Sequence, residues 1–377
     1  MKNPSSWRLI RRKCWRCSLV ALLPAAFLLP GANCRADATV HRLGVSLALS
    51  GPNAEYGSAV QNGIQFALDE NPDIKQRLLP IFEDDRYDPK TTVSNLQKLA
   101  DIDGIEMLLV WGNESALAAA PVAEGRKLPT VVVAQHPKSG AGFKYVFRFI
   151  NPAEDYSKSM LNYLRTQGTK HFLAIKTEIS FFNILLDEFQ NGLQANESLS
   201  VYESFAVGDS DFRTTIAKLK QQTFDMLGVY LNPPQSIQFF RQAVELGFHP
   251  QVFGSTPFES KAVIKEAGGY IDGSVYSQLG VDESFRERYI KRFGDDIQIA
   301  YAANAYDFVS VADKALRDLP SHPAAEKVLD ALAKSADASG MCGPHRYRVS
   351  EKSGKFFEFD IVVKKIEGSK IVILGHY

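Results

Sequence analysis

The feature that most constrains the fold is a regular alternation of short apolar runs with amphipathic stretches of helix length. In the first half, strand-like runs occupy residues 42–49, 78–83, 107–111 and 130–134. After a polar stretch near Asn151 the rhythm restarts, with runs at 171–176, 201–207, 226–231 and 251–254. Repeated strand–helix–strand order is typical of a parallel sheet. The chain is therefore predicted to contain two doubly wound α/β units.

Several predicted helices begin with recognisable signals directly after a strand. Ser50, Gly51 and Pro52 precede a helix at 58–68, Asp88 and Pro89 precede one at 90–100, and Asn232 with two prolines precedes one at 235–246. In open α/β sheets, this carboxyl edge of the strands is where loops and helix N-termini face a ligand. A long helix is predicted at 301–316, and a β-hairpin is predicted from 356–366 and 370–374.

The first 38 residues are typical of a secretory signal peptide. Five basic residues between Arg8 and Arg16 precede an apolar run at 19–29, and Ala36-Asp37-Ala38 supplies small residues for cleavage. The apolar run is shorter than the roughly 20 residues needed to span a bilayer. We therefore expect a mature protein exported to the periplasm. Lipid attachment at Cys34 and twin-arginine export through Arg11 and Arg12 stay open as alternative routes.

Size and composition limit the classes of protein that the mature chain could represent. The leader contains three of the four cysteines, so Cys342 has no partner for an internal disulfide. The remaining 339 residues exceed what one hydrophobic core normally holds, which favours two lobes. The precursor has 43 basic and 43 acidic residues, and loss of the basic leader leaves a mildly acidic chain. A nucleic-acid partner, which needs a clustered basic face, is not expected.

A series of short motifs resembles the leucine/isoleucine/valine-binding type of exported solute-binding protein. The motifs cover the mature chain in a specific order: Ser50-Gly51-Pro52, Tyr56-Gly57, Asp84-Asp85, Asp88-Pro89, Gly112, Leu128-Pro129, Phe147-Arg148, Asp211-Phe212, Ala217-Lys218-Leu219, Arg241-Gln242-Ala243 and Leu246-Gly247. The resemblance implies the type I periplasmic binding protein fold, with two α/β lobes joined by three crossings of the chain. Lobe one would comprise residues 39–154 plus 279–356, and lobe two residues 155–278 plus 357–377.

The resemblance also implies a function and a set of ligand-binding positions. Such proteins hold a small molecule between the lobes, close on it, and deliver it to an ABC permease in the inner membrane. Tyr56 and Tyr301 match aromatic pocket positions of the family, and Phe181 stands near another. The candidate ligand-binding residues are Tyr56, Asn113, Ser115, Ala116, Ala134, His136, Phe181, Asn232, Thr256 and Tyr301.

Three positions depart from the pattern that this family uses for α-amino acids. The hydroxyl that would hold the carboxylate falls on Ala116, with Ser115 one place early, and the second hydroxyl position is His136. The acidic residue that would pair with the ammonium group is replaced by Thr256. A buried ammonium without a carboxylate partner is costly. The cleft is therefore predicted to hold a neutral or anionic small molecule with apolar or aromatic surface.

Structural roles compete with ligand contact at several of these residues. Asn232 and Thr256 could cap the helices that they precede. Asp84, Asp85 and Asp88 could form a metal or catalytic cluster, although the resemblance favours a bracing role at a strand-to-helix turn. The sequence has no Gly-x-Ser-x-Gly elbow, phosphate-binding loop, dinucleotide fingerprint or His-Glu-x-x-His motif. We therefore expect no enzyme activity, no metal and no cofactor. A ligand sensor that docks on a membrane receptor is the chief alternative, and a hydrolase built in the cleft is the second.

Overall fold

The computed structural model describes residues 39–377 apart from 268, 336–337 and 369. Its first sheet has the order β11-β12-β13-β5-β4-β3-β1-β2. The strands of this sheet are β1 (His41–Leu47), β2 (Leu78–Asp84), β3 (Met107–Trp111), β4 (Thr130–Val133), β5 (Val146–Arg148), β11 (Ala338–Gly340), β12 (Gly343–Ser350) and β13 (Gly354–Phe359). Strands β1 to β5 are parallel, β13 joins β5 in parallel, and β12 and β11 are antiparallel additions.

The second sheet repeats the same winding, in the order β15-β14-β10-β9-β8-β6-β7. Its strands are β6 (His171–Thr177), β7 (Ser198–Phe205), β8 (Met226–Tyr230), β9 (Val252–Gly254), β10 (Val275–Leu279), β14 (Ile361–Glu367) and β15 (Lys370–His376). Strands β6 to β10 are parallel, and β14 pairs antiparallel with β10. Two doubly wound sheets of this kind confirm the predicted α/β fold class.

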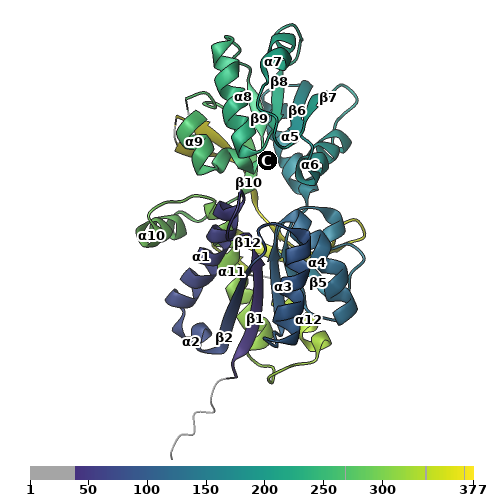
Figure 1. Cartoon of the computed structure of the whole chain (residues 1–377), viewed down its shortest axis with the longest axis vertical. Helices are drawn as coiled ribbons and strands as arrows, with labels where there is room; N and C mark the ends of the chain where they lie inside the picture. The colour runs from purple at the N-terminus through teal and green to yellow at the C-terminus, as the bar shows by residue number, and fades with distance from the viewer. Residues whose placement is uncertain (1–38, 268, 336–337, 369) are drawn as a thin grey trace, which may run out of the picture. The chain divides into compact units, whose positions relative to one another are not determined.

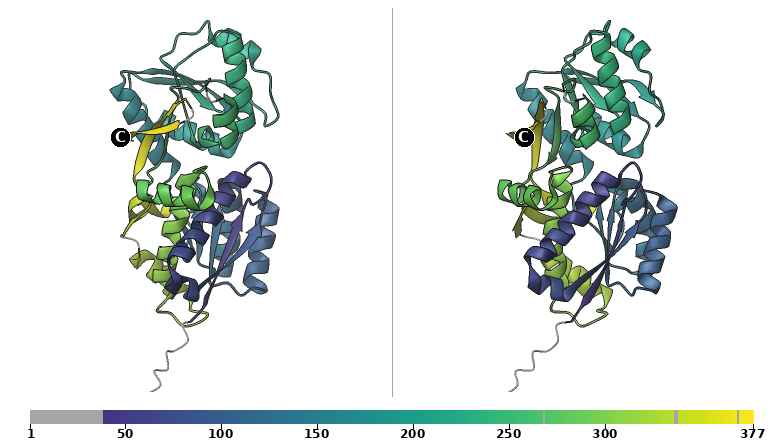
Figure 2. Two further views of the ribbon diagram at one scale, coloured as in Figure 1. Left: turned by 90° about the vertical axis from the view of Figure 1, so that its left-hand side faces the viewer. Right: turned by 60° about the vertical axis from the view of Figure 1, so that its left-hand side comes forward.

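Helices cover both faces of each sheet (Figures 1 and 2). Around the first sheet lie α1 (Ala54–Glu70), α2 (Pro72–Arg77), α3 (Pro89–Asp101), α4 (Asn113–Arg126), α10 (Glu283–Phe293), α11 (Ile299–Leu316) and α12 (Ala325–Lys334). Around the second lie α5 (Ala153–Thr166), α6 (Ser180–Asn191), α7 (Arg213–Leu219), α8 (Pro233–Glu245) and α9 (Lys261–Ala267). Two 3-10 turns, η1 (Pro137–Ser139) and η2 (Thr256–Glu259), follow β4 and β9.

The alternation of side chains along β3 divides the core of the first sheet. Met107 and Leu109 pack with α1 and α11, whereas Leu108 and Val110 pack with α3 and α4. All four side chains are fully buried. A strand that is apolar on both faces is what a parallel sheet covered by helices requires, which explains the unbroken apolar run in the sequence.

The chain passes between the sheets three times, and the third passage differs from the sequence prediction. Strand β13 ends at Phe359 in the first sheet and β14 begins at Ile361 in the second, so Asp360 alone separates them. The expected lobe limit at 356/357 therefore falls inside β13, and the predicted run 356–366 is two strands. The hairpin itself is formed by β14 and β15. The apolar run gives no turn signal at Asp360, because the strands keep their alternation while changing sheets.

The predicted strand at 201–207 begins earlier, since β7 spans Ser198–Phe205 at the edge of the second sheet. Ser198 and Ser200 are polar and exposed, with only the partly buried Leu199 between them, so the hydrophobic pattern misses this start. Among the described residues, the structure has no helix long and apolar enough to cross a membrane.

Candidate functional site

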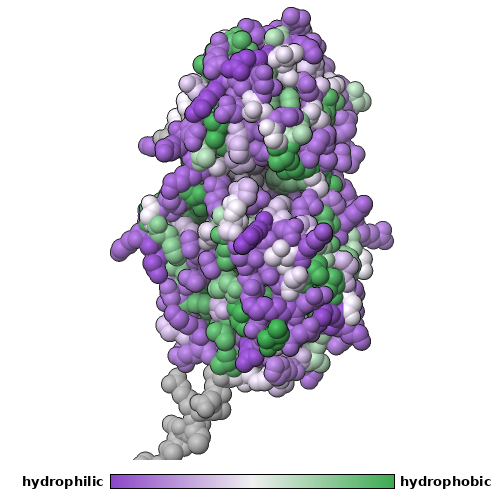
Figure 3. All heavy atoms as spheres, viewed as in Figure 1, coloured by the Kyte–Doolittle hydropathy of each residue, from purple (hydrophilic) through white to green (hydrophobic). Residues whose placement is uncertain are grey.

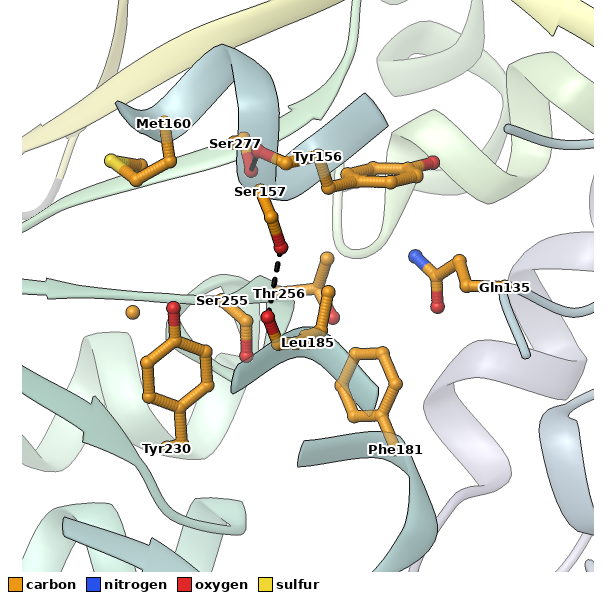
Figure 4. Close-up of a pocket in the computed structure, with 11 residues that line it drawn as sticks. Gln135, Tyr156, Ser157, Met160, Phe181, Leu185, Tyr230, Ser255, Thr256 and Ser277 are labelled. Carbon is orange, nitrogen blue, oxygen red and sulfur yellow. Dashed lines mark hydrogen bonds between the residues drawn. The ribbon is translucent and has the colours of Figure 1, made fainter. Parts of the chain in front are cut away.

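A cavity lies where strands β8, β9 and β10 meet α5 and α6, with one residue from the loop after β4 (Figure 4). Its lining residues are Gln135, Tyr156, Ser157, Met160, Phe181, Leu185, Tyr230, Gly254, Ser255, Thr256 and Ser277. All of these side chains are apolar, aromatic, hydroxyl-bearing or amide-bearing, and none of the lining residues in the described part of the chain is charged. The face drawn in Figure 3 is hollowed across its middle, with hydrophobic side chains at the rim.

The hydroxyl groups in this lining fall into two kinds. Ser157 Oγ donates to the carbonyl oxygen of Leu185 at 2.9 Å, and Ser277 Oγ donates to that of Tyr156 at 3.0 Å. Ser255 Oγ is buried and has no hydrogen-bonding partner among the described residues. Burial raises the pKa of the Tyr156 phenol well above its usual range, an effect that the nearby Gln135 amide partly opposes. The cavity therefore presents neutral hydrogen-bonding groups on an apolar background.

An aromatic cluster of Tyr56, Tyr87, Trp111 and Tyr301 adjoins this cavity on the side of the first sheet. Tyr56 stacks on Trp111 with ring centroids 5.2 Å apart, and Tyr301 meets both rings edge-on at 5.8 and 5.9 Å. Burial raises the pKa of the Tyr301 phenol. A hydrogen bond with Thr256 of the cavity partly opposes this shift. Residues of both sheets thus form one continuous aromatic and hydroxyl-rich surface.

Two glycines let this cluster form. A β-carbon at Gly57 would lie 2.0 Å from the carbonyl oxygen of Ala48, so only glycine lets α1 approach the end of β1 and present Tyr56. Gly112 has φ 96°, and a β-carbon there would lie 2.3 Å from the ring of Tyr87. These contacts give a physical reason for two of the glycines in the sequence motifs.

Of the ten predicted ligand-binding residues, Phe181 and Thr256 line the cavity, and Tyr56 and Tyr301 belong to the adjoining aromatic cluster. Asn113, Ser115 and Ala116 lie on the first turn of α4 and are buried. Asn113 Oδ1 accepts the backbone N–H of His136 at 3.0 Å. Ser115 Oγ accepts from Thr92 at 3.0 Å. Ala116, like Ala134, packs in the apolar core between the first sheet and helices α3 and α4.

His136 and Asn232 lie near the cavity but do not line it. His136 Nδ1 accepts the backbone N–H of Lys138 at 3.2 Å, and burial, with a smaller contribution from Lys138, lowers the pKa of its imidazole. Asn232 Oδ1 accepts the N–H of Gln235 at 3.1 Å and so caps α8, in line with the structural alternative.

The His136 loop is held in place by a fully buried arginine, Arg148 of β5. Its Nη2 donates to the carbonyl oxygens of His136 and Pro137 at 2.8 and 2.9 Å, and its Nη1 donates to that of Ser353 at 3.1 Å. Burial lowers the pKa of this guanidinium to about 10. Arg148 therefore fixes the loop that supplies Gln135 to the cavity.

The three aspartates after β2 brace the turn rather than converge on a site. Asp84 accepts the backbone N–H groups of Leu49 and Arg86. Asp85 accepts the backbone N–H of Tyr87 and the hydroxyl of Ser46. Asp88 caps α3. Burial raises the pKa of Asp85, whereas hydrogen bonds lower that of Asp84. In the described ranges, no group of three or more His, Cys, Asp or Glu side chains is placed to hold a metal ion.

A buried carboxylate does exist close to Thr256 in the sequence, at Glu259. Its Oε1 accepts from Lys364 Nζ at 2.7 Å and from the Tyr276 hydroxyl at 2.9 Å. The Glu259 and Lys364 side chains are only 3% and 5% exposed, so the carboxylate has its own cationic partner inside the second sheet. Glu259 is not among the residues that line the cavity.

The sequence analysis missed most of the lining. After β4 the lining residue is Gln135, the immediate neighbour of the predicted His136, whereas after β9 the predicted Thr256 lines the cavity together with Ser255. Tyr156, Ser157 and Met160 come from α5, where they follow an ordinary amphipathic pattern. The chain has no signal there that separates a cavity-lining face from a core-facing one.

Comparisons with known proteins agree with this architecture. A family model described as "Periplasmic binding protein" matches residues 41–358, so the chain belongs to this family. The leucine-specific-binding protein of Salmonella typhimurium is 25% identical over 354 residues, covering 86% of this chain and 91% of that protein. These findings confirm the resemblance to the leucine/isoleucine/valine-binding type.

Solved structures show the same type I periplasmic binding protein fold. One is the branched-chain amino acid transporter substrate-binding protein of Streptococcus pneumoniae, solved with isoleucine. It has a TM-score of 0.78 and 18% identity, and the match covers 89% of this chain and 100% of that one. A solute-binding protein of R. palustris, solved with benzoate, has a TM-score of 0.73 and 17% identity over 89% of this chain and 96% of that one. Proteins with this fold therefore hold chemically different solutes.

Proposed function

We propose that residues 1–38 direct this protein to the periplasm and are then removed. The mature protein captures a small organic solute and delivers it to an ABC permease of the inner membrane. The leader lies outside the described residues, and its role is inferred from the sequence alone. The two lobes would be built on the two sheets, with the solute held at the carboxyl ends of their strands. Family membership supports the transport role.

The solute that we favour is neutral or anionic, with apolar or aromatic surface. The supporting observation is that no charged side chain lines the cavity in the described part of the chain. An α-amino acid would bring an ammonium group, and the nearest candidate partner in the sequence, Glu259, is already paired with Lys364. Leaving a buried ammonium unpaired costs several kcal/mol, on the order of a thousandfold in affinity. The benzoate bound to the R. palustris relative has the chemistry that we favour.

Native mass spectrometry of the protein as isolated tests this proposal directly. We expect a bound small molecule that lacks a primary ammonium group. The same molecule, added at a hundredfold excess over its Kd, should stabilise the protein by about 2.7 kcal/mol in thermal unfolding. Leucine, isoleucine and valine should give little shift. A large shift with leucine would mean that the solute class is wrong.

His136→Ala provides a test of one predicted ligand-binding residue. If the imidazole contacts the solute, its removal should lower affinity for that solute about tenfold while the melting temperature of the unliganded protein changes little. Its side chain is half-buried and accepts one backbone N–H, so the effect on the fold is small. Titration calorimetry measures the affinity, and an unchanged Kd would assign His136 to the loop alone.

A further inference from the structure

Two hydroxyl groups in the cavity have a hydrogen-bonding capacity that the described protein groups leave unused. Ser255 Oγ is buried without a partner, and the Ser255 residue is 6% exposed. The Tyr230 hydroxyl, on a residue 4% exposed, has its pKa raised by burial alone. Both residues line the cavity, and Figure 4 draws their side chains on the wall formed by β8 and the segment after β9. A buried hydroxyl without a partner is costly, and an acceptor oxygen from a bound molecule would remove that cost.

Two other hydroxyl groups in the lining, those of Ser157 and Ser277, have already donated their protons. Ser157 donates to Leu185 and Ser277 donates to Tyr156, in each case to a backbone carbonyl oxygen. They can accept a hydrogen bond but are not free donors. The Tyr156 hydroxyl is also buried without a partner among the described residues, but in Figure 4 it lies on the Gln135 side of the cavity. Ser255 and Tyr230 are therefore the unused donors on the wall formed by β8 and the segment after β9.

The remaining walls are apolar and leave little room. Met160, Leu185 and Phe181 supply apolar side chains to the lining, and the unfilled space among all lining residues is ≈ 290 Å³, most of which opens to solvent. With every side chain in place, the enclosed part holds about one water molecule. A ring therefore enters only if a lining side chain moves, and Phe181, half-buried on the first turn of α6, is the side chain whose change of rotamer would enlarge the space.

We propose that this cavity is a solute subsite within the second lobe, in which the hydroxyls of Ser255 and Tyr230 donate hydrogen bonds to a carbonyl or carboxylate oxygen carried on an aromatic ring. Met160, Leu185 and Phe181 pack on the ring. The inference rests on the proposed function, because it names the residues and the chemical group by which the solute is selected. A cationic head group is rejected, since the subsite has neutral donors and no carboxylate in its lining.

Benzamide, benzoate and benzylamine test this subsite, because they share one ring and differ in the charge of the head group. Titration calorimetry with the mature protein should show binding of benzamide and benzoate. Benzylamine should bind at least a hundredfold more weakly than benzamide. Ser255→Ala and Tyr230→Phe should each weaken benzamide and benzoate binding fivefold to tenfold, the effect of one lost hydrogen bond.

Two exposed positions of the same lobe provide matched controls. Ser200→Ala and Tyr270→Phe remove the same hydroxyl groups from exposed residues and should leave both affinities unchanged. The melting temperature of each unliganded variant tests whether Ser255 and Tyr230 have a purely structural role. Since each cavity variant removes an unpaired buried hydroxyl, its melting temperature should stay the same or rise.

Three results would overturn the subsite: none of the three compounds binds, benzylamine binds as well as benzamide, or both cavity variants keep the affinity of the unaltered protein. The proposed function fails separately. A protein that carries another solute through purification, with an affinity indifferent to Ser255→Ala and Tyr230→Phe, keeps its binding function and loses this subsite.

Discussion

Replacing Arg148 by methionine should lower the free energy of unfolding by about 3–5 kcal/mol, the largest effect that we expect from a single substitution outside the cavity. Methionine fills similar volume but cannot donate a hydrogen bond, so three buried or partly buried carbonyl oxygens lose their charged partner. The loss releases both the His136 loop and the turn at Ser353. Urea unfolding followed by circular dichroism measures the change.

Arg148→Lys should recover only part of this stability, because one ammonium group cannot reproduce the forked geometry of a guanidinium. Arg213→Met is the matched control, since Arg213 is exposed and forms only surface ion pairs. It should change the unfolding free energy by about 0.5 kcal/mol or less. Equal losses at Arg148 and Arg213 would contradict the structural role given to the buried guanidinium.

Asp307→Asn should change the pH dependence of stability. Asp307 of α11 is buried and accepts the backbone N–H groups of Met341 and Cys342 at 2.6 and 2.9 Å, and desolvation raises its pKa to about 6. A carboxyl whose folded pKa exceeds its unfolded value contributes stability that is fully present below about pH 3.8 and is lost as the pH rises through 6. The full contribution is about 3 kcal/mol, of which about 1.4 kcal/mol is gained between pH 7.5 and pH 5.

The measurement is a series of urea unfolding curves from pH 7.5 to pH 5, taken for both proteins. The difference between unaltered protein and Asp307→Asn isolates the contribution of this carboxyl from those of other acids. Asp318→Asn, at a side chain 86% exposed, should show no such difference. A difference for Asp307→Asn that stays constant over this range would mean that the carboxyl titrates elsewhere.

The fold could be predicted from the sequence because the spacing of the apolar runs and the helix-start signals both indicate alternating strands and helices. The run at 107–111 matches β3 residue for residue, and helices begin at the proline signals after Asp88 and Asn232. The third crossing could not be predicted. Asp360 interrupts neither the alternation nor the apolar character of its neighbours, and only the pairing of β13 with β5 and β14 with β10 separates the strands.

The site was harder to predict than the fold for a physical reason. Strand ends locate a cavity to within a residue or two, but which side chain faces it depends on the turn that follows. Gln135 lines the cavity, whereas its neighbours Ala134 and His136 were favoured from sequence, and Ser255 lines it beside the predicted Thr256. The contribution of Tyr156 and Met160 depends on how α5 packs against β10 and β14, which is set by contacts far apart in the chain. The pairing of Glu259 with Lys364 spans 105 residues and has no local signal.

Cys342 is the single cysteine among the described residues, and its reactivity can be used to measure local opening of the fold. Cys342 is 1% exposed, lies beside the Asp307 carboxylate, and has its thiol pKa raised well above the ordinary range by burial. Only a thiolate that reaches solvent reacts with an alkylating reagent. The rate at which this sulfur atom is alkylated therefore measures how often the corner between α11 and β12 opens to solvent. No engineered probe is needed for this measurement.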